Sequence, residues 1–167
     1  MNEINIPEGL FPIAATVGAV TFNGGVTCDN ISLKNIEMVW IHVFLTRTNT
    51  HNEIYTPLCG TLVATCATAL PQEVPIWKAD SSTVTTKFVR QTDAKNYTML
   101  NTETGPCHLI FQIDPNQLQA AGVANDCLGM TIGSAGHADV IGTVVYWVKP
   151  RYGSRVIDRD TTEFIVD

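Results

Sequence analysis

Ile36-Glu-Met-Val-Trp-Ile-His-Val-Phe-Leu-Thr-Arg47 is the run from which the fold class follows. Successive side chains of a β-strand point to opposite sides of its sheet, so the two alternating sets of residues are read separately. Both sets are apolar in this run. It therefore predicts a central strand that is covered on both sides. The two faces are Met38, Trp40 and Phe44 on one side, and Val39, Ile41, Val43 and Leu45 on the other.

The same two-residue periodicity recurs along the chain, with many β-branched residues and hardly any helical spacing. It predicts strands joined by turns. We expect a tight hairpin within residues 15–33, because the runs 16–22 and 26–33 flank Asn23-Gly-Gly25. Asn and Gly tolerate the positive φ that such a turn demands. Further strands are predicted at 55–69 (one long strand or a pair), 83–89, 107–113, 126–132 and 139–148, with a short strand-like run at 163–166.

Prolines divide this pattern and help to set the fold class. Pro71 and Pro75 predict a break, because proline cannot donate a hydrogen bond to a sheet. Asp114-Pro115 supplies an N-cap and a first-turn proline for one short helix through Ala121, with Gly122 after its end. About eight to ten strands in one domain indicate a sandwich or barrel. The predicted fold class is all-β: a single domain over 1–167, a β-sandwich or jelly-roll-like barrel with one short helix and extended N- and C-terminal segments.

Composition limits the partners of this chain. Its 167 residues suffice to bury roughly 70% of the unfolded surface in one core. Charged residues make up 16% of the chain, against a usual share of about 25%. Much of the surface must then be neutral and polar, or covered by a partner. The net charge of −6 opposes attraction to phosphate backbones and anionic lipid, so neither nucleic acid nor a membrane is expected as a partner.

The chain lacks the sequence signals of export. Met1-Asn-Glu-Ile-Asn-Ile-Pro-Glu8 has neither a basic region nor a continuous apolar region, so we expect no secretory signal. No stretch approaches the roughly 18 uncharged apolar residues of a membrane-spanning helix. We therefore expect synthesis in a cytoplasm and a soluble product. The odd number and irregular spacing of the cysteines favour reduced, mostly buried thiols over disulfides. They are Cys28, Cys59, Cys66, Cys107 and Cys127.

The histidines show no catalytic or metal-binding pattern. His42, His51, His108 and His137 lack the spacing of zinc ligands. His42 lies in an apolar strand, which predicts a hydrogen-bonded core or edge residue. Cys107 and His108 are neighbours in a strand and therefore point to opposite faces, which opposes a thiol–imidazole pair.

The remaining motifs of chemistry are also missing. Gly133-Ser-Ala-Gly136 predicts a turn between strands rather than a nucleophile elbow, and no phosphate-binding glycine loop occurs. A carboxylate pair for glycoside hydrolysis stays open, because such pairs leave no fixed spacing. The C-terminal acidic residues predict a solvated charged face rather than a calcium site, since arginines stand among them. These are Asp158, Asp160 and Glu163, with Arg155 and Arg159. We predict no catalytic, cofactor-binding or metal-binding residue, and no enzyme.

The tryptophans receive two different interpretations. Trp40 and Trp147 stand in strongly apolar strands, which predicts core positions. Trp77 stands in the proline-marked segment Val74-Pro-Ile-Trp-Lys78. For Trp77 two interpretations stay open: a residue that covers the core, or an exposed residue that stacks on a sugar or anchors a protein interface.

Three runs in the C-terminal third resemble a known class of proteins. They are Ile113-Asp-Pro-Asn-Gln-Leu118, Asn125-Asp-Cys-Leu-Gly-Met-Thr-Ile132 and Gly142-Thr-Val-Val-Tyr-Trp-Val-Lys-Pro-Arg-Tyr152. An acidic-capped turn followed by two strands, the last closing on Pro-Arg-Tyr, resembles small structural proteins of tailed bacteriophages. The resemblance implies an accessory capsid protein of the cement or decoration type, located in the virion on the capsid surface. Such proteins bind the major capsid protein and often form homotrimers, and no functional residue is carried over.

The leading hypothesis is therefore a cement protein that bridges adjacent major capsid proteins and reinforces the shell. Its contacts are expected in the segments 1–11 and 151–167, because extended termini gain contact area with little fold of their own. One alternative is a carbohydrate- or receptor-binding module of a phage tail or fibre, with Trp77 and Tyr97 as an exposed platform. Another is a neck or tail-completion protein, which a particle holds in few copies.

Overall fold

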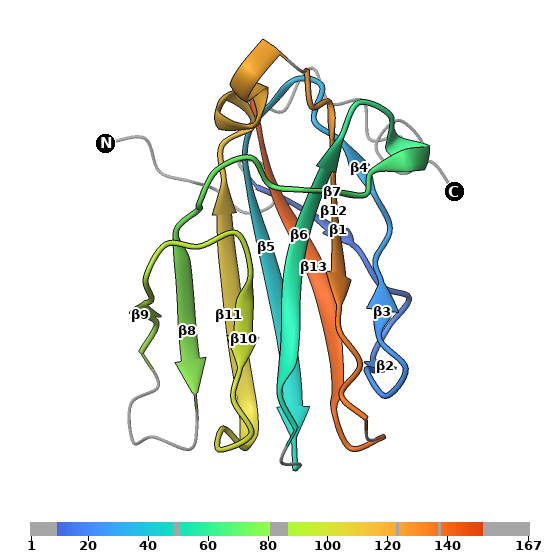
Figure 1. Ribbon diagram of the computed structural model, residues 1–167, viewed down its shortest axis with the longest axis vertical. Coiled ribbons are helices and arrows are strands. Elements are labelled where there is room, and N and C mark those ends of the chain that lie inside the picture. Colours follow the sequence, from blue (N-terminus) through green and yellow to red (C-terminus); the bar gives the residue numbers. More distant parts are fainter. Residues whose placement is uncertain (1–9, 49–50, 81–86, 123, 137, 152–167) are drawn as a thin grey trace.

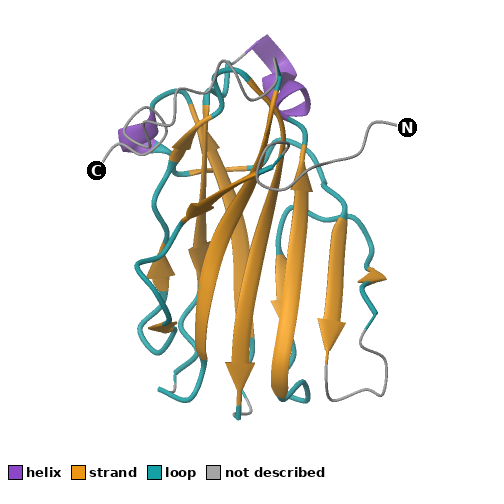
Figure 2. Ribbon diagram, turned by 180° about the vertical axis from the view of Figure 1, so that it is seen from behind, coloured by secondary structure: helices purple, strands orange, loops and turns teal. Residues whose placement is uncertain are grey.

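The computed structural model describes residues 10–48, 51–80, 87–122, 124–136 and 138–151. These residues form two antiparallel sheets packed as a sandwich (Figure 1). They contain no α-helix and two 3-10 helices, which lie at one end of the sandwich (Figure 2). The predicted all-β sandwich is confirmed. No helix of the described part is long and apolar enough to cross a membrane.

The larger sheet has seven strands, and β5 (Ile36–Arg47) lies in its interior. On one side β5 pairs with β13 (Ile141–Pro150), and on the other with β11 (Gly105–Ile113). The remaining strands are β1 (Phe11–Ala14) and β2 (Val20–Thr21), which both pair with β13, then β8 (Ile76–Asp80) beside β11, and β9 (Val89–Arg90) at the edge.

The smaller sheet has six strands, built around β6 (Glu53–Gly60) and β12 (Cys127–Ile132). Its other strands are β10 (Tyr97–Met99) and β7 (Thr68–Ala69), which pair with β6, and β3 (Val26–Thr27) and β4 (Ile31–Ser32), which pair with β12. The 3-10 helix η1 (Val63–Thr65) lies between β6 and β7, and η2 (Pro115–Gly122) follows β11.

The core lies between the two sheets and follows the strand alternation. Val39, Ile41 and Val43 of β5 are fully buried, as are Val144 and Tyr146 of β13. Burying each such side chain contributes roughly 1.5–3 kcal/mol, so these alternating positions dominate the stability of the domain. In β13 these buried residues alternate with the half-buried Val145 and Trp147.

The predicted hairpin around Asn23-Gly-Gly25 is wrong. The tight turn exists: the Gly25 amide donates to the Phe22 carbonyl at 3.1 Å, and Gly25 has a φ of 81°. However, β2 before it pairs in the larger sheet and β3 after it pairs in the smaller one, so the turn connects the two sheets. The reason is Phe22, which is fully buried and packs edge-on against Tyr55, so the chain turns into the core.

Two further expectations about 36–47 and the tryptophans need correction. The strand is buried on one face, whereas on the other Met38 and Trp40 are half-buried and Phe44 is 38% exposed. The smaller sheet packs on one side of β5, and the second side faces outward. Trp40 and Trp147 are therefore on the outside of the larger sheet and not in the core between the sheets.

The predicted short helix is in place but is of the 3-10 type. The Gln117 amide donates to the Asp114 carbonyl at 3.0 Å, which is the i to i+3 pattern of this tighter helix. The Asp114 side chain caps its start by accepting from the Asn116 amide at 2.9 Å. Asp114 and Pro115 therefore predicted the residue at which this helix begins. The i to i+4 hydrogen-bond pattern of an α-helix does not form.

Several strands were not predicted: β1, β8 and β10. The prolines around 71–75 hid β8, yet Pro75 precedes the strand and its carbonyl accepts from the Gln112 amide at 3.0 Å, so no ladder donor is lost. Of the two alternatives left open for 55–69, one long strand or a pair, the structure has the pair, β6 with β7. Of the strand expected at 83–89, Val89 lies in β9, and residues 81–86 are outside the described part. The run 163–166 is outside it as well.

Candidate functional site

Strand register gathers the aromatic residues of the larger sheet on its outer side. Trp147 of β13 pairs directly with Trp40 of β5, and Trp77 of β8 pairs with Ile110 of β11. The chain has three tryptophans, and all three share this side. We define the outer face as Met38, Trp40, His42, Phe44, Trp77, His108, Ile110, Gln112, Thr143, Val145 and Trp147.

No Asp, Glu, Lys or Arg is among the residues of the outer face, although two of them are histidines. Register places Lys149 opposite Met38 and Arg90 opposite Trp77, so these two charges stand at the margins of the outer face, and both are partnered. Lys149 pairs with Glu37 at 2.8 Å, and Arg90 pairs with Asp93 at 2.8 Å while lying over the Trp77 ring, 5.8 Å from its centroid. When charges stand at the rim of an aromatic centre, contact with a partner requires little desolvation of charged groups. Protein interfaces commonly have this composition.

Four rings form a cluster at the middle of this face. His42 stacks on Phe44 with ring centroids 3.8 Å apart, and His108 lies 4.8 Å from Phe44. Phe88, which is 45% exposed, lies 6.1 Å from His42 and 6.0 Å from His108. The two histidines face each other, with His42 Nε2 and His108 Nδ1 3.3 Å apart. His42 is therefore hydrogen-bonded as predicted, but on the outer side of an interior strand.

Burial and, to a smaller extent, the neighbouring His108 lower the pKa of His42 to about 4. At neutral pH the His42 imidazole is therefore neutral. The hydrogen bond between the two rings then joins a donor nitrogen to an acceptor nitrogen. The cluster adds no fixed positive charge from His42 to the face.

A groove of about 420 Å³ extends the ring cluster toward one end of the sheet. Its walls include Phe44, Pro106, His108 and Ile141, of which Ile141 is 48% exposed. Gly142 also lines the groove, and the space beside its Cα is crowded. A Cβ at Gly142 would stand 2.5 Å from the Phe44 carbonyl oxygen, so a side chain is excluded.

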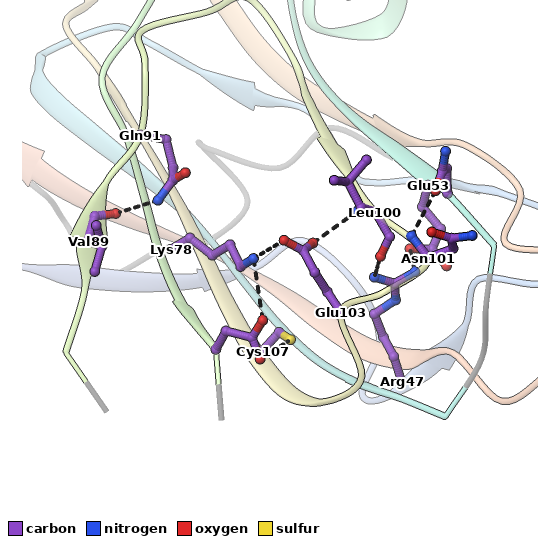
Figure 3. Close-up of polar contacts among 11 residues, drawn as sticks. Arg47, Glu53, Lys78, Val89, Gln91, Leu100, Asn101, Glu103 and Cys107 are labelled. Atoms are coloured by element: carbon purple, nitrogen blue, oxygen red, sulfur yellow. Dashed lines mark hydrogen bonds and ion pairs between the residues drawn. The ribbon is translucent and has the colours of Figure 1, made fainter. Parts of the chain in front are cut away.

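A polar network lies between the two sheets, at the end opposite the 3-10 helices (Figure 3). Arg47 and Glu53 are fully buried and form an ion pair at 2.9 Å. The Arg47 guanidinium also donates to the carbonyl oxygens of Leu100, at 2.8 Å, and His51. Burial raises the pKa of Glu53, and the Arg47 charge opposes that rise. This network ties the ends of β5, β6 and β10 together.

The carboxylates of this end do not form a free catalytic pair. Lys78 contacts both Glu103 and Asp80, the latter at 3.4 Å. Glu103 also accepts from the Leu100 amide at 3.0 Å, which holds the turn after β10. Hydrolysis of a glycoside needs a carboxylic acid and a carboxylate exposed on both sides of the sugar bond. Here the acidic side chains are engaged by cations and backbone, and in the described residues no three potential metal ligands gather.

All five cysteines are buried and none forms a disulfide, which confirms the predicted state of the thiols. Burial raises the pKa of Cys28 to about 12 and that of Cys107 to about 11. Protonated thiols are poor nucleophiles, so these side chains serve packing. Cys107 points inward and contacts Asp80 at 3.7 Å, whereas His108 points outward, as their adjacency predicted.

A second hollow, of about 620 Å³, lies beside η2 and is rich in amide side chains. Its amide side chains bond to backbone carbonyls and to Arg151. Asn125 donates to the Leu118 carbonyl at 2.6 Å, Gln119 donates to the Asn125 carbonyl at 3.2 Å, and Arg151 donates to Asn116 at 3.3 Å. These contacts fasten η2 and the end of β13, so we assign this hollow a structural role.

The platform expected from Trp77 and Tyr97 does not form. Trp77 is on the outer face of the larger sheet, whereas Tyr97 is in β10 of the smaller sheet and packs against the core. Sequence reasoning missed Trp40, Trp147 and Phe44 as surface residues. Trp40 and Phe44 alternate on the second face of 36–47, and this pattern was interpreted as contact with a second covering layer. The segment Gly133-Ser-Ala-Gly136 lies between strands β12 and β13, as predicted, and it bends at Gly136, whose φ is 67°.

The fold and the outer face define a class of architecture: an all-β sandwich with an aromatic sheet face that has Lys and Arg only at its margins. Comparison of the chain with protein-family models, curated proteins and solved structures finds no match. A function is therefore inferred from the surface itself and from the resemblance in the C-terminal third.

Proposed function

We propose that this chain is a structural protein of a tailed-bacteriophage virion, a capsid cement or decoration protein that binds the major capsid protein. The observation that carries the proposal is the outer face, which presents three tryptophans and keeps its Lys and Arg side chains at the margins. The resemblance of 113–118, 125–132 and 142–152 to phage structural proteins supports the choice of partner.

Interface energetics support a protein partner on this face. A stable interface buries about 800 Å² on each partner, and a few Trp, Tyr and Arg residues near its centre dominate the affinity. Trp40 and Trp147 are neighbours across β5 and β13, so a partner that covers one of them also covers the other. The exposed Phe44 lies further along the same strand and extends the contact area.

The termini are the second expected contact. The segments 1–11 and 151–167 lie outside the described residues except for Leu10, Phe11 and Arg151. Phe11 already belongs to β1 and pairs with Val148, so it is part of the sandwich rather than of a free arm. We propose that residues after Tyr152 reach a neighbouring subunit in the shell, in a homotrimer. A chain cut after Tyr152 should remain folded and lose particle binding, and unchanged binding excludes this role for the tail.

The first experiment is the copy number of this chain in purified particles, measured by quantitative mass spectrometry against the major capsid protein. A ratio near one supports the cement role. A ratio that is lower by two orders of magnitude supports a location in the neck or tail instead. Absence from particles overturns the virion assignment.

A matched pair of variants tests the outer face directly. Phe44→Asp places a charge on the outer face, and Ile54→Asp places one on an exposed residue of β6 in the smaller sheet. Both residues are exposed, at 38% and 48%, so both variants should fold. We expect Phe44→Asp to abolish sedimentation with shells that lack the protein, while Ile54→Asp binds normally. Equal binding of the two variants refutes the assignment of this face.

A carbohydrate-binding module of a tail or fibre is the second candidate, because tryptophan rings stack well on sugars. The observation that favours it is the shared face of Trp40, Trp77 and Trp147. Binding on a glycan array that is lost in Trp147→Ala would support it. No binding on the glycan array, together with binding to shells, supports the cement role over the carbohydrate-binding role.

A further inference from the structure

The facing histidines of the outer face have the spacing of two ligands of one metal ion. His42 Nε2 and His108 Nδ1 are 3.3 Å apart. Two imidazole nitrogens bound to one tetrahedral zinc ion at about 2.05 Å each stand about 3.3 Å from one another. The same spacing therefore suits a shared proton in the absence of metal and a shared metal ion in its presence.

The position of the pair favours metal binding. The two rings belong to adjacent strands, β5 and β11, whose pairing fixes their separation. Stacking on Phe44 and contact with Phe88 restrict the ring orientation, so little conformational entropy remains to be lost on chelation.

Within the described residues, the strand positions that pair with the two histidines add no third ligand. Across the ladders His42 pairs with Ile110 and Val145, and His108 pairs with Phe44 and Ala79. None of these four neighbours carries a group that binds zinc. The two remaining positions of a tetrahedral ion are therefore left to water or to a donor from a molecule bound on the outer face.

We propose that His42 and His108 form a two-histidine binding site for a divalent transition-metal ion, zinc above all, on the outer face of the larger sheet. Imidazole ligands suit zinc, nickel and copper rather than calcium or magnesium. This site does not depend on the capsid role. The metal would place a positive charge in the ring cluster, away from the marginal Lys149 and Arg90, and would offer open coordination positions to whatever binds there.

The test is isothermal titration of the full, tag-free chain with zinc chloride in a buffer that does not bind metal. The variants are His42→Phe and His108→Phe, which keep an aromatic ring in the cluster and remove the ligand nitrogen. His51→Ala is the matched control, because it removes a histidine that is not part of the pair. Thermal unfolding of each variant confirms that it folds.

We expect one zinc ion per chain, an affinity at least about tenfold lower in each Phe variant, and unchanged binding in His51→Ala. Histidine ring ¹⁵N resonances of His42 and His108 should shift together on zinc addition. One zinc per two chains with dimer formation also supports the site, since a second pair then completes the tetrahedron. No binding to the native chain, or binding lost in one Phe variant alone, overturns it.

Discussion

Replacing Glu53 by Leu removes the carboxylate that lies 2.9 Å from the buried Arg47 guanidinium and keeps a side chain of similar volume. Both partners are fully buried, so the charge left behind has no solvent to stabilise it. Breaking a buried ion pair from one side costs about 3–5 kcal/mol. Domains of this kind have a total stability of about 5–15 kcal/mol, so a large part of it should be lost.

The assay is urea unfolding followed by tryptophan fluorescence. With a urea dependence of about 2 kcal/mol per molar, a loss of about 4 kcal/mol moves the midpoint down by about 2 M. Glu37→Leu is the matched control, because Glu37 pairs with Lys149 at 2.8 Å on the surface, where such pairs contribute about 0–1 kcal/mol. If Glu53→Leu lowers the midpoint no more than Glu37→Leu does, the buried pair is not the fastening that we describe.

Three further predictions concern crowding, protonation and thiol access. Gly142→Ala should lower the free energy of unfolding by about 1–3 kcal/mol, because the added Cβ meets the Phe44 carbonyl and the Phe22 ring. Urea titration measures this loss, and an unchanged midpoint contradicts the crowding. The pKa of His42 is lowered from 6.5 to about 4 by folding, so the unfolded chain binds more protons within that range. Stability should fall by about 1–3 kcal/mol from pH 6.5 to pH 4 through this residue, and His42→Phe should show a shallower pH dependence than the native chain. Cys28, whose pKa burial raises to about 12, should react with an aromatic disulfide reagent only after unfolding; fast labelling of the folded chain at neutral pH refutes its burial.

The fold class could be predicted from the sequence because its signal is local. Alternation of apolar residues over 36–47, 107–113 and 139–148 sets side-chain direction within each strand, and the structure has β5, β11 and β13 at these places. Asp114-Pro115 likewise sets the start of η2 through a cap and a fixed φ. Short strands such as β1 and β10 left too few residues for a period to show.

Pairing partners and the candidate site were decided by tertiary structure. Asn23-Gly-Gly25 determines a tight turn, but whether the flanking residues pair with one another depends on Phe22, whose burial against Tyr55 directs the chain from one sheet to the other. An apolar second face on 36–47 is equally compatible with a covering layer and with an outward surface. The alternation shows to which side of the sheet a side chain points, and it does not show whether another layer packs on that side. The approach of His42 to His108 likewise depends on the register between β5 and β11, a long-range contact that no local pattern encodes.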